Sequence, residues 1–415
     1  MEKLSVGFIG CGSMAIEHKD ALGELYNAGC RDFRVISVCD IVESKAEFMA
    51  DEFEKITGFR PTVYTDSDKM LSSEKELQSV LVITPHSNHH TLAMAAMNAG
   101  VNVMVEKPIG FTIRVAKDMM ECANKTGKLL HVAENYRMDL SERAIKWAVS
   151  SGMIGTPRML TWLDIGERKW YWNWRDHIDI AGGAWTLDGG VHHSDLFQLN
   201  LGPVNKVWAV SRAYETTRYA KYKNLDDYEQ ARRENRYAYF RKTRSLKQID
   251  PLTMEEPVTA TVEDTTCALL EFESGVVGTW TVSRAAPGKI DRSNVIYGSE
   301  GALYWYDGIY NASGDQIYTR EGLAEAFLKA ITAEEKEILF PYGVRNSLSI
   351  EWKQHFDALN GIRPVEVNAE VGLMAMAVPM AIYESATIGA PVLMKDVLDL
   401  KVEVYQAKLN EIIGV

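Results

Sequence analysis

Gly10-Cys11-Gly12-Ser13-Met14-Ala15 follows the short apolar run Ser5 to Ile9 and opens Met14 to Asn27, whose apolar residues have helical spacing. In the pattern G-x-G-x-x-A, the first glycine permits a tight turn and the second lets backbone approach a pyrophosphate. The small Ala15 lets the helix pack on the strand. Free N–H groups at the start of the helix would bind the anion. The stretch predicts a dinucleotide-binding turn, with an incidental tight turn as the alternative; the predicted contacts are Gly10, Gly12, Ser13 and Met14.

Strands and helices continue to alternate through the first third of the chain. Val35 to Cys39, Val80 to Ile83 and Val101 to Val105 are apolar runs, and His90 to Ala99 reads as a helix that ends at Gly100. Such alternation is typical of βαβ units and of a parallel sheet covered on both faces. We therefore predict an α/β dinucleotide-binding domain over residues 1–134.

Residues 135–415 have a different pattern, in which strand-like runs are separated by turns that contain glycine. The runs are Arg158 to Asp164, Val258 to Phe272, Val276 to Ser283, Ser293 to Tyr297 and Ala302 to Tyr306. They predict a large, mostly antiparallel sheet in an α+β domain. Two helices are expected near the end, over Asn346 to Asn360 and Ala369 to Gly389.

Two segments of the second domain, at about 212–257 and 308–345, look inserted. The second is expected to hold a short amphipathic helix near Leu323 to Ile331. We interpret each as a surface helix with its loops, and a lid or an oligomer contact is the alternative.

Composition narrows the class of protein. The 415 residues carry a net charge of −12, which disfavours nucleic acid and anionic membranes as partners. Five scattered cysteines have no C-x-x-C spacing, so neither a disulfide framework nor a thiolate zinc site is expected. We see no signal peptide and no apolar run long enough for a membrane span. A cytoplasmic protein is therefore expected.

Asp40 ends the second predicted strand. A carboxylate at this place accepts hydrogen bonds from the adenosine ribose and repels a 2′-phosphate. The next residue, Ile41, offers no cation to such a phosphate. We therefore predict NAD rather than NADP, with an ordinary strand-end turn as the alternative role of Asp40.

Glu106-Lys107-Pro108 follows the strand that ends at Val105, at the edge of the sheet where ligands bind in open α/β folds. A lysine there can donate to a substrate hydroxyl and ease the loss of its proton. The alternative is a surface ion pair between Lys107 and Glu106. Whether Pro108 follows a cis bond is left open.

Asp188 and His192 stand four residues apart in the run Gly182 to Asp195. On one helical face they would touch, and a carboxylate that orients an imidazole forms a general base. We predict His192 as the base and Asp188 as its orienting acid. The alternatives are a packed core histidine and a metal site of His192, His193 and Asp195.

Aromatic and guanidinium side chains are dense between Trp162 and Arg175. Such groups stack on sugar rings and bond to hydroxyls, although packing in a core explains them equally well. Side chains near the ends of the strands are expected to reach the cofactor. The predicted substrate contacts are Tyr136, Arg168, Trp174, Arg175 and His193, and the further cofactor contacts are Thr84, Pro85, His89, Glu106 and Lys107, with His86 as an alternative to His89.

Together, the glycine turn, Thr84-Pro85, Glu106-Lys107-Pro108 and Gly182 through His192 resemble the Gfo/Idh/MocA family (glucose–fructose oxidoreductase, inositol dehydrogenase and rhizopine catabolism proteins). The resemblance implies a Rossmann domain, a second domain with an open sheet, and dimers or tetramers formed through that sheet. It implies hydride transfer between NAD(P) and a hydroxyl carbon of a sugar or cyclitol. Lys107 would be the lysine of the E-K-P motif, and Asp188 and His192 the acid and base of the D-x-G-x-H motif, although the double histidine leaves His193 open as the base.

Three functions are compatible with these residues. The first is an NAD-dependent dehydrogenase of a sugar, glycoside or cyclitol. The second is a glycoside-cleaving enzyme that oxidises a ring hydroxyl transiently, eliminates the aglycone and returns the hydride. The third is a regulator that binds NAD without catalysis, which the retention of Lys107, Asp188 and His192 disfavours.

Overall fold

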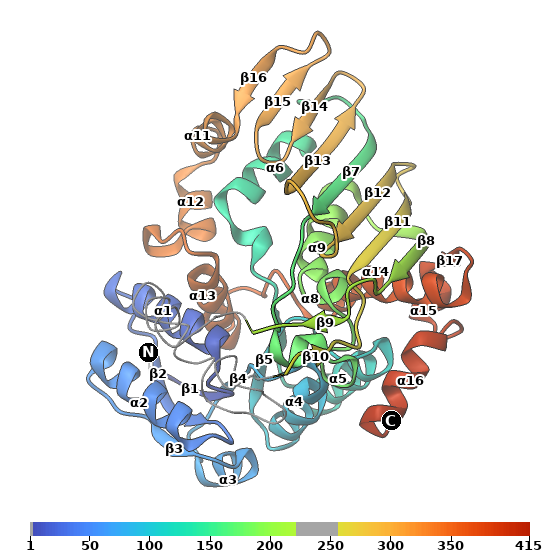
Figure 1. Ribbon diagram of the computed structural model, residues 1–415. Coiled ribbons are helices and arrows are strands. Elements are labelled where there is room, and N and C mark those ends of the chain that lie inside the picture. Colours follow the sequence, from blue (N-terminus) through green and yellow to red (C-terminus); the bar gives the residue numbers. More distant parts are fainter. Residues whose placement is uncertain (1–2, 221–255) are drawn as a thin grey trace.

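The computed structural model describes residues 3–220 and 256–415 and contains two large sheets (Figure 1). The first sheet is entirely parallel, with the order β3-β2-β1-β4-β5-β6. Its strands are β1 (Leu4–Ile9), β2 (Phe33–Cys39), β3 (Thr62–Tyr64), β4 (Ser79–Val82), β5 (Asn102–Glu106) and β6 (Leu130–Ala133). The predicted α/β domain is thus confirmed as a Rossmann-type sheet.

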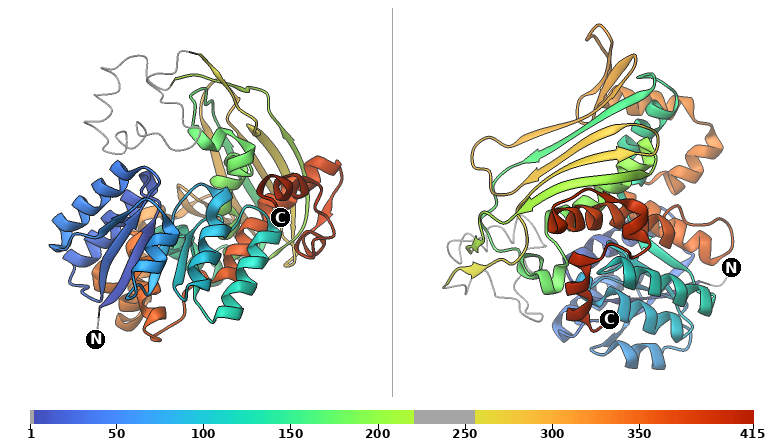
Figure 2. Two further views of the ribbon diagram at one scale, coloured as in Figure 1. Left: turned by 90° about the horizontal axis from the view of Figure 1, so that it is seen from below. Right: turned by 90° about the vertical axis from the view of Figure 1, so that its right-hand side faces the viewer.

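Helices follow the strands of this sheet and lie on its two faces (Figure 2). They are α1 (Ser13–Asn27), α2 (Glu43–Thr57), α3 (Ser67–Ser73), η1 (His86–Asn88), α4 (His89–Asn98) and α5 (Ile113–Thr126). The chain reverses its direction across the sheet between β1 and β4. Ligands bind at the carboxyl ends of the strands beside such a reversal.

The second sheet has nine strands in the order β16-β15-β14-β13-β7-β12-β11-β8-β17. Only β7 and β12 pair in parallel, so the prediction of a mostly antiparallel sheet is confirmed. The strands are β7 (Pro157–Ile165), β8 (Val204–Arg212), β11 (Thr265–Phe272), β12 (Val277–Ser283), β13 (Asp291–Gly298), β14 (Gly301–Tyr304), β15 (Gly308–Asn311), β16 (Gln316–Thr319) and β17 (Val392–Leu393).

One face of the second sheet is packed and the other is open. Burial alternates along β8 and β11, and the inner residues pack against helices such as α14, which contacts β8 and α9. On the outer face, Trp208, Leu269 and Val277 are 44%, 49% and 52% exposed. A half-buried antiparallel sheet has this alternation.

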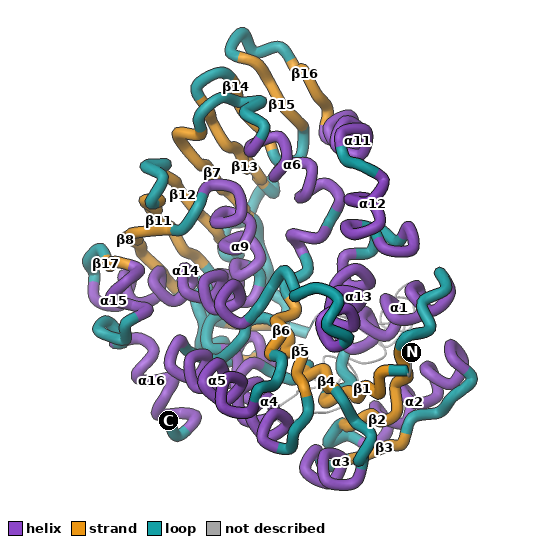
Figure 3. The backbone as a smooth tube through the Cα atoms, turned by 180° about the vertical axis from the view of Figure 1, so that it is seen from behind, coloured by secondary structure: helices purple, strands orange, loops and turns teal. Residues whose placement is uncertain are grey.

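The helices and 3-10 turns of this part of the chain complete the fold (Figure 3). They are η2 (Tyr136–Met138), α6 (Leu140–Ser150), η3 (Asn173–Asp176), α7 (Ile178–Ala181), α8 (Trp185–Asp188), α9 (Gly190–Leu201), α11 (Arg320–Ala330), α12 (Ala333–Leu339), η5 (Pro341–Gly343), α13 (Ser347–Leu359), α14 (Ala369–Ile388), α15 (Met394–Leu398) and α16 (Val404–Ile413).

The two inserted segments have different outcomes. In 308–345 the amphipathic helix is present as α11, but the segment also supplies β15 and β16, which extend the sheet rather than forming only loops. Each of these strands has only four residues, and its apolar residues are adjacent rather than alternating, so the sequence does not mark it as a strand. Most of 212–257 lies outside the described residues; its flanks form a two-stranded ribbon of β9 (Thr217–Arg218) and β10 (Val258–Thr259).

Two further elements depart from the sequence analysis. The expected strand Val258 to Phe272 is interrupted between β10 and β11. Helix α14 is long and apolar enough by composition to cross a membrane, which the sequence analysis overlooked. Inside the protein, 72% of its apolar window is buried, as in a core helix of a globular domain.

Helix α13 returns from the second part of the chain to the first. It packs against α1, where the indole Nε1 of Trp352 donates to Nδ1 of His18 at 3.0 Å. Ser349 donates to Glu24 and to the Ala21 carbonyl at 2.7 and 3.1 Å. The proposed division at residue 134 therefore does not separate two independent packing units, because a distant helix completes one face of the first sheet.

Candidate active site

The glycine turn joins β1 to α1 as expected. Gly10 has φ +105°, and a Cβ there would lie 2.3 Å from the Ile83 carbonyl oxygen, so only glycine fits. A Cβ on Gly12 would meet nothing within 4 Å. Ser13 is exposed at the first turn of α1, whose N–H groups have no side-chain cap. This open, uncapped helix start fits a pyrophosphate.

Asp40 lies at the end of β2 and is tied to the glycine turn. Its Oδ2 accepts from the backbone N–H of Cys11 at 2.8 Å, and its Oδ1 accepts from that of Val42 at 2.9 Å. Each carboxylate oxygen keeps a second lone pair that a ribose hydroxyl can use. The carboxylate thus holds the turn in place from where it would contact the ribose.

Thr84 and His89 lie beside the end of β4. The Thr84 methyl group approaches the position that a side chain on Gly10 would occupy. His89 is fully buried, and its two ring nitrogens lie 2.9 Å from the carbonyl oxygens of Thr84 and Pro108. The prediction that His89 contacts the cofactor is wrong, because no part of its ring reaches the surface. Its role is to hold together the segments that follow β4 and β5.

Glu106 is buried and holds the backbone of Lys107 in place. Its Oε1 lies 2.9 Å from Nε2 of His18, and its Oε2 accepts from the backbone N–H of Lys107 at 3.0 Å. Burial opposes ionisation, but the contact with His18 and the charge of Lys107 lower its pKa. The Lys107–Pro108 bond is cis. Glu106 is an anchor of the lysine backbone, and the surface ion pair that we considered for Lys107 is not formed.

The Lys107 ammonium instead contacts Asp188, at the end of α8. Nζ donates to the backbone oxygen of Asp188 at 2.7 Å and to its Oδ1 at 3.0 Å. An ammonium has three donors, so one remains for a ligand. The contact brings together the carboxyl end of β5 and the glycine-rich segment of the second domain.

Asp188 is surrounded by donors. Arg175 Nε donates to its Oδ2 at 2.9 Å, and His86 Nε2 lies 3.3 Å from its Oδ1. Burial favours the neutral acid, but Arg175, Lys107 and His86 hold the pKa of Asp188 well below its usual range. Asp188 is therefore a buried, ionised carboxylate that holds three basic side chains around one point.

Trp174 and Arg175, two of the predicted substrate residues, lie at this point. The guanidinium of Arg175 is 4.2 Å from the centre of the Trp174 ring, and that ring meets the edge of His86 at 4.7 Å between centroids. Both side chains are partly exposed. They are thus placed to contact a ligand above Asp188.

His192 has a partner that the sequence analysis did not identify. Its Nδ1 lies 2.6 Å from Oε1 of Glu134, the residue that directly follows β6. The prediction that Asp188 orients His192 is wrong. Asp188 is engaged by Lys107 and Arg175, and a spacing of four residues contributes only a few tenths of a kcal/mol against such buried contacts.

In the sequence analysis, Glu134 appears only as the last residue of the first domain. One signal was available: it is an acid at the carboxyl end of a parallel strand, as Asp40 and Lys107 are polar groups at the ends of theirs. Its pairing with His192 joins residues 58 positions apart, which spacing alone does not show.

Burial sets the charge of this second pair. It raises the pKa of Glu134 to about 8 and, with the charge of Lys107, lowers the pKa of His192 to about 3. Near neutral pH both groups are therefore neutral, and the Glu134 hydroxyl donates to Nδ1. Within the described residues, Nε2 of His192 has no hydrogen bond to protein.

Tyr136 fixes the plane of the imidazole. Its ring stacks on His192 with centroids 3.8 Å apart and planes within 3°. Tyr136 is 44% exposed. It is thus placed both to hold the histidine and to contact a ligand. The substrate contact predicted for Tyr136 is compatible with this position.

His193 and Arg168 lie elsewhere. His193 is half-buried against the rings of Trp162 and Trp280, at 4.7 and 6.2 Å between ring centroids, and desolvation lowers its pKa to about 3. Neighbouring residues on a helix point apart, so His193 does not compete with His192 for Lys107. Arg168 is 8% exposed and forms a two-bond ion pair with Asp176 at 2.7 and 3.2 Å. The expected substrate contact of Arg168 is wrong, because its donors serve this buried pair.

The residues of the alternative metal site have other partners. Asp195 pairs with Arg137, His192 with Glu134, and His193 lies among aromatic rings. Over residues 3–220 and 256–415, no three such side chains come together around a point suited to a cation.

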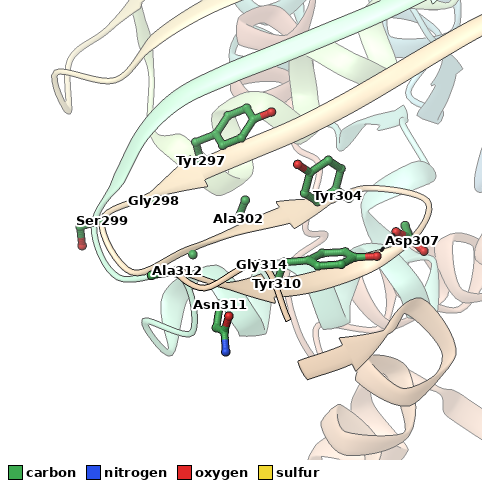
Figure 4. Close-up of a pocket in the computed structure, with 11 residues that line it drawn as sticks. Tyr297, Gly298, Ser299, Ala302, Tyr304, Asp307, Tyr310, Asn311, Ala312 and Gly314 are labelled. Atoms are coloured by element: carbon green, nitrogen blue, oxygen red, sulfur yellow. Dashed lines mark hydrogen bonds between the residues drawn. The ribbon is translucent and has the colours of Figure 1, made fainter. Parts of the chain in front are cut away.

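Two hollows lie in the second part of the chain. One, of about 600 Å³, is an open groove over the β13–β15 hairpins, lined by Tyr297, Tyr304 and Tyr310 (Figure 4). None of Lys107, Asp188 and His192 lines it. The other, of about 250 Å³, is lined by Tyr136, which stacks on His192, and so lies beside that histidine.

Comparisons with known proteins assign the chain to a family. Residues 4–134 match the family described as "Oxidoreductase family, NAD-binding Rossmann fold", and residues 143–304 match the "GFO/IDH/MocA C-terminal domain". The two matches together cover more than half of the chain, which belongs to the Gfo/Idh/MocA family. It is an NAD-dependent oxidoreductase of that family.

Two curated relatives and one solved structure illustrate which proteins this chain is similar to. The D-glucoside 3-dehydrogenase of Escherichia coli is 25% identical over 66% of this chain and 68% of its own length. A glycosyl hydrolase family 109 protein of Shewanella baltica is 25% identical over 51% of this chain, which spans less than half (46%) of that relative. The structure of the WlbA dehydrogenase from Bordetella pertussis, in complex with NADH and UDP-GlcNAcA, aligns with TM-score 0.66 and 20% identity over 94% of this chain and 98% of its own.

Proposed function

We propose that this member of the Gfo/Idh/MocA family oxidises a ring hydroxyl of a sugar, glycoside or cyclitol, with His192 as the base and Lys107 as the stabilising cation. The observation that supports it most is the His192–Glu134 contact at 2.6 Å, which leaves Nε2 without a protein partner beside Lys107. The glycine turn and Asp40 would hold NAD, which would supply the acceptor for the hydride of the carbon that bears the hydroxyl.

The proton moves through the chain's own residues. Nε2 of His192 takes the hydroxyl proton, and the free donor of Lys107 Nζ contacts the oxygen as its negative charge develops. Nε2 carries a lone pair when Nδ1 holds the hydrogen and Glu134 is ionised. Because the pKa of Glu134 lies at about 8, we expect oxidation to increase as the pH rises through that value. The reverse reduction, which needs a proton on Nε2, is favoured below it.

The test follows cofactor and product together. The purified protein with NAD is given free sugars, cyclitols and aryl glycosides, and reduced nicotinamide and released aglycone are both recorded. Net reduction without aglycone release supports the dehydrogenase. An absence of turnover with every compound, despite saturable ligand binding, would leave a regulator and reject the proposal.

A second candidate is glycoside cleavage, which the 25% identity to a glycosyl hydrolase family 109 protein favours. A transient ring ketone would acidify the neighbouring C–H, and loss of that proton would expel the aglycone. Water would then add to the resulting double bond, and the hydride would return to the ketone. Aglycone release with no net reduction of NAD would select this candidate over the first.

Self-assembly is the remaining part of the proposal. The open face of the second sheet exposes Trp208, Leu269 and Val277, which are apolar and lie on adjacent strands. Patches of this kind mark protein interfaces. We expect a dimer or tetramer by light scattering and a shift toward monomer in Leu269→Lys; a wild-type monomer would contradict it. The cytoplasmic location, and the absence of nucleic-acid and membrane partners, stay predictions.

A further inference from the structure

The cavity of about 250 Å³ beside the catalytic group is built by several distant elements. Its walls include Tyr136 and Glu142 from the start of the second domain, Trp162 from β7, Trp305 after β14, and Arg320 at the start of α11. Arg320 comes from the inserted segment 308–345, to which the proposed function gives no role. The cavity is smaller than pockets for drug-sized ligands, which begin at about 300 Å³. It can therefore accept about one ring.

Polar atoms in its walls lack partners. Oε2 of Glu142, Nε1 of Trp162 and Nδ1 of His193 are buried and make no hydrogen bond within the described part of the chain. Glu142 and Trp162 are 7% and 2% exposed, and His193 is half-buried. Burying such atoms without a partner costs free energy, and a ligand or water that reached them from the cavity would offset that cost.

Further groups give the cavity both donors and acceptors. Trp305 Nε1 donates to Glu142 Oε1 at 3.1 Å, and a guanidinium nitrogen of Arg320 lies 3.8 Å from the same oxygen. Burial raises the pKa of Glu142 to about 7, so this carboxyl either donates or accepts near neutral pH. A neutral ligand with several hydroxyls matches a wall of this kind.

The remaining surface is aromatic. The rings of Trp162 and Trp305 meet edge to face at 5.0 Å, and Tyr136 and Tyr306 also line the cavity. Aromatic faces pack against apolar surface and leave polar tips for hydrogen bonds. A sugar ring offers both, since its C–H bonds form apolar faces and its hydroxyls point outward.

The cavity cannot hold the reacting carbon, because Lys107, Asp188 and His192 do not line it. Tyr136 connects the two places, since it stacks on His192 and also forms a cavity wall. We propose that the cavity is a subsite for a second hydroxylated ring, joined to the ring that is oxidised, so that the preferred substrate is a glycoside of at least two sugar units. The inference rests on the proposed function and specifies its substrate class.

The experiment compares matched one-ring and two-ring compounds. Methyl hexosides and the corresponding disaccharides, such as methyl β-glucoside with cellobiose and methyl α-glucoside with maltose, are assayed with NAD. The same sugars are titrated calorimetrically into the NAD-loaded protein. We expect kcat/KM to be at least about tenfold higher for the disaccharide of the preferred linkage.

Two variants test the walls. Trp162→Phe removes an unpartnered donor and keeps a ring, and Glu142→Gln keeps the shape but changes the acceptor. Each is expected to reduce the two-ring over one-ring ratio of kcat/KM by about tenfold, mainly through KM. Trp280→Phe is the matched control, because Trp280 also has a buried, unpartnered Nε1 but does not line the cavity.

The outcomes separate the two proposals. Oxidation of methyl hexosides with no two-ring preference, or an equal loss of ratio in Trp280→Phe, rejects the subsite and retains the oxidoreductase. An aryl glycoside of the same sugar is assayed beside them, and a preference for it over the disaccharide rejects a hydroxylated second ring. Disaccharide binding that Trp162→Phe weakens, without oxidation of any sugar, supports the subsite and rejects the proposed function.

Discussion

Two buried carboxyl groups flank the same site, and near neutral pH one is ionised and the other is neutral. Asp188 is 5% exposed and Glu134 is fully buried, so burial alone would keep both neutral. Asp188 faces Lys107 and Arg175 and is ionised, whereas Glu134 faces a neutral imidazole and keeps its proton near neutral pH. The difference indicates that the number of neighbouring cations, rather than depth, decides which of the two carboxyl groups is ionised near neutral pH.

Removing the cation should have the largest effect. Lys107→Ala takes away both a partner of Asp188 and the donor to the developing oxyanion, so kcat should fall by about 10²–10³-fold. Steady-state kinetics measure this, and NAD titration confirms that the cofactor site is intact. Lys206→Ala, in the exposed pair with Glu271, is the control. Turnover within a factor of ten of wild type would remove Lys107 from the chemistry.

Removing the charge of the anchor should act chiefly on stability. Asp188→Asn leaves Lys107 and Arg175 without a counter-ion and should lower the free energy of unfolding by about 3 kcal/mol. The pKa of Asp188 is depressed in the folded state. Its contribution is therefore present above its unfolded pKa of about 3.9 and is lost as the pH falls through the folded value.

Urea unfolding of wild type and Asp188→Asn at pH 7 and at low pH checks this. The difference between them should shrink as the pH decreases below about 4. A difference that is constant with pH would mean that shape, and not charge, explains the loss.

Changing the neutral carboxyl should alter pH dependence more than rate. In Glu134→Gln, the amide oxygen that faces the ring can only accept a hydrogen bond, so Nδ1 keeps its hydrogen. The lone pair of Nε2 is then available at every pH. Oxidation should lose its step near pH 8 and change by about tenfold or less at its maximum. The pH profile of kcat/KM is the measurement, and a step that persists unchanged would assign it to another group.

The smallest effect is expected at the stacked ring. Tyr136→Phe keeps the stack on His192 and should change kcat by less than about threefold, whereas Tyr136→Ala loses it and should cost about tenfold. Equal losses in the two variants would assign the role to the hydroxyl group rather than to the ring.

Much of the fold was predictable from local patterns. Gly10 and Gly12 stand between an apolar run and a helical repeat, and only one type of turn needs that arrangement. The alternating runs of the second domain predicted its sheet. β15 and β16 were missed because each has four residues without an alternating pattern, and such a run between turns resembles a loop.

The site was only partly predictable. Lys107, Asp188 and His192 were identified from motifs, and the structure brings them to one place, but the assignment of partners differed. Arg168 was misplaced because a dense run of cations and aromatics looks the same whether it faces a ligand or a buried aspartate. His89 was misplaced because its burial depends on two segments that meet only in the fold.

The sequence by itself determined the parallel sheet with its nucleotide turn and the identity of the lysine and histidine, because these follow from residues that are near one another along the chain. The tertiary structure alone decided that Glu134 holds His192, that Asp188 holds Lys107, and that Arg320 and Trp162 share one cavity wall. The physical reason is that a hydrogen bond or a pKa depends on which distant groups exclude water and supply charge. The spacing of residues along the chain does not show which groups these are.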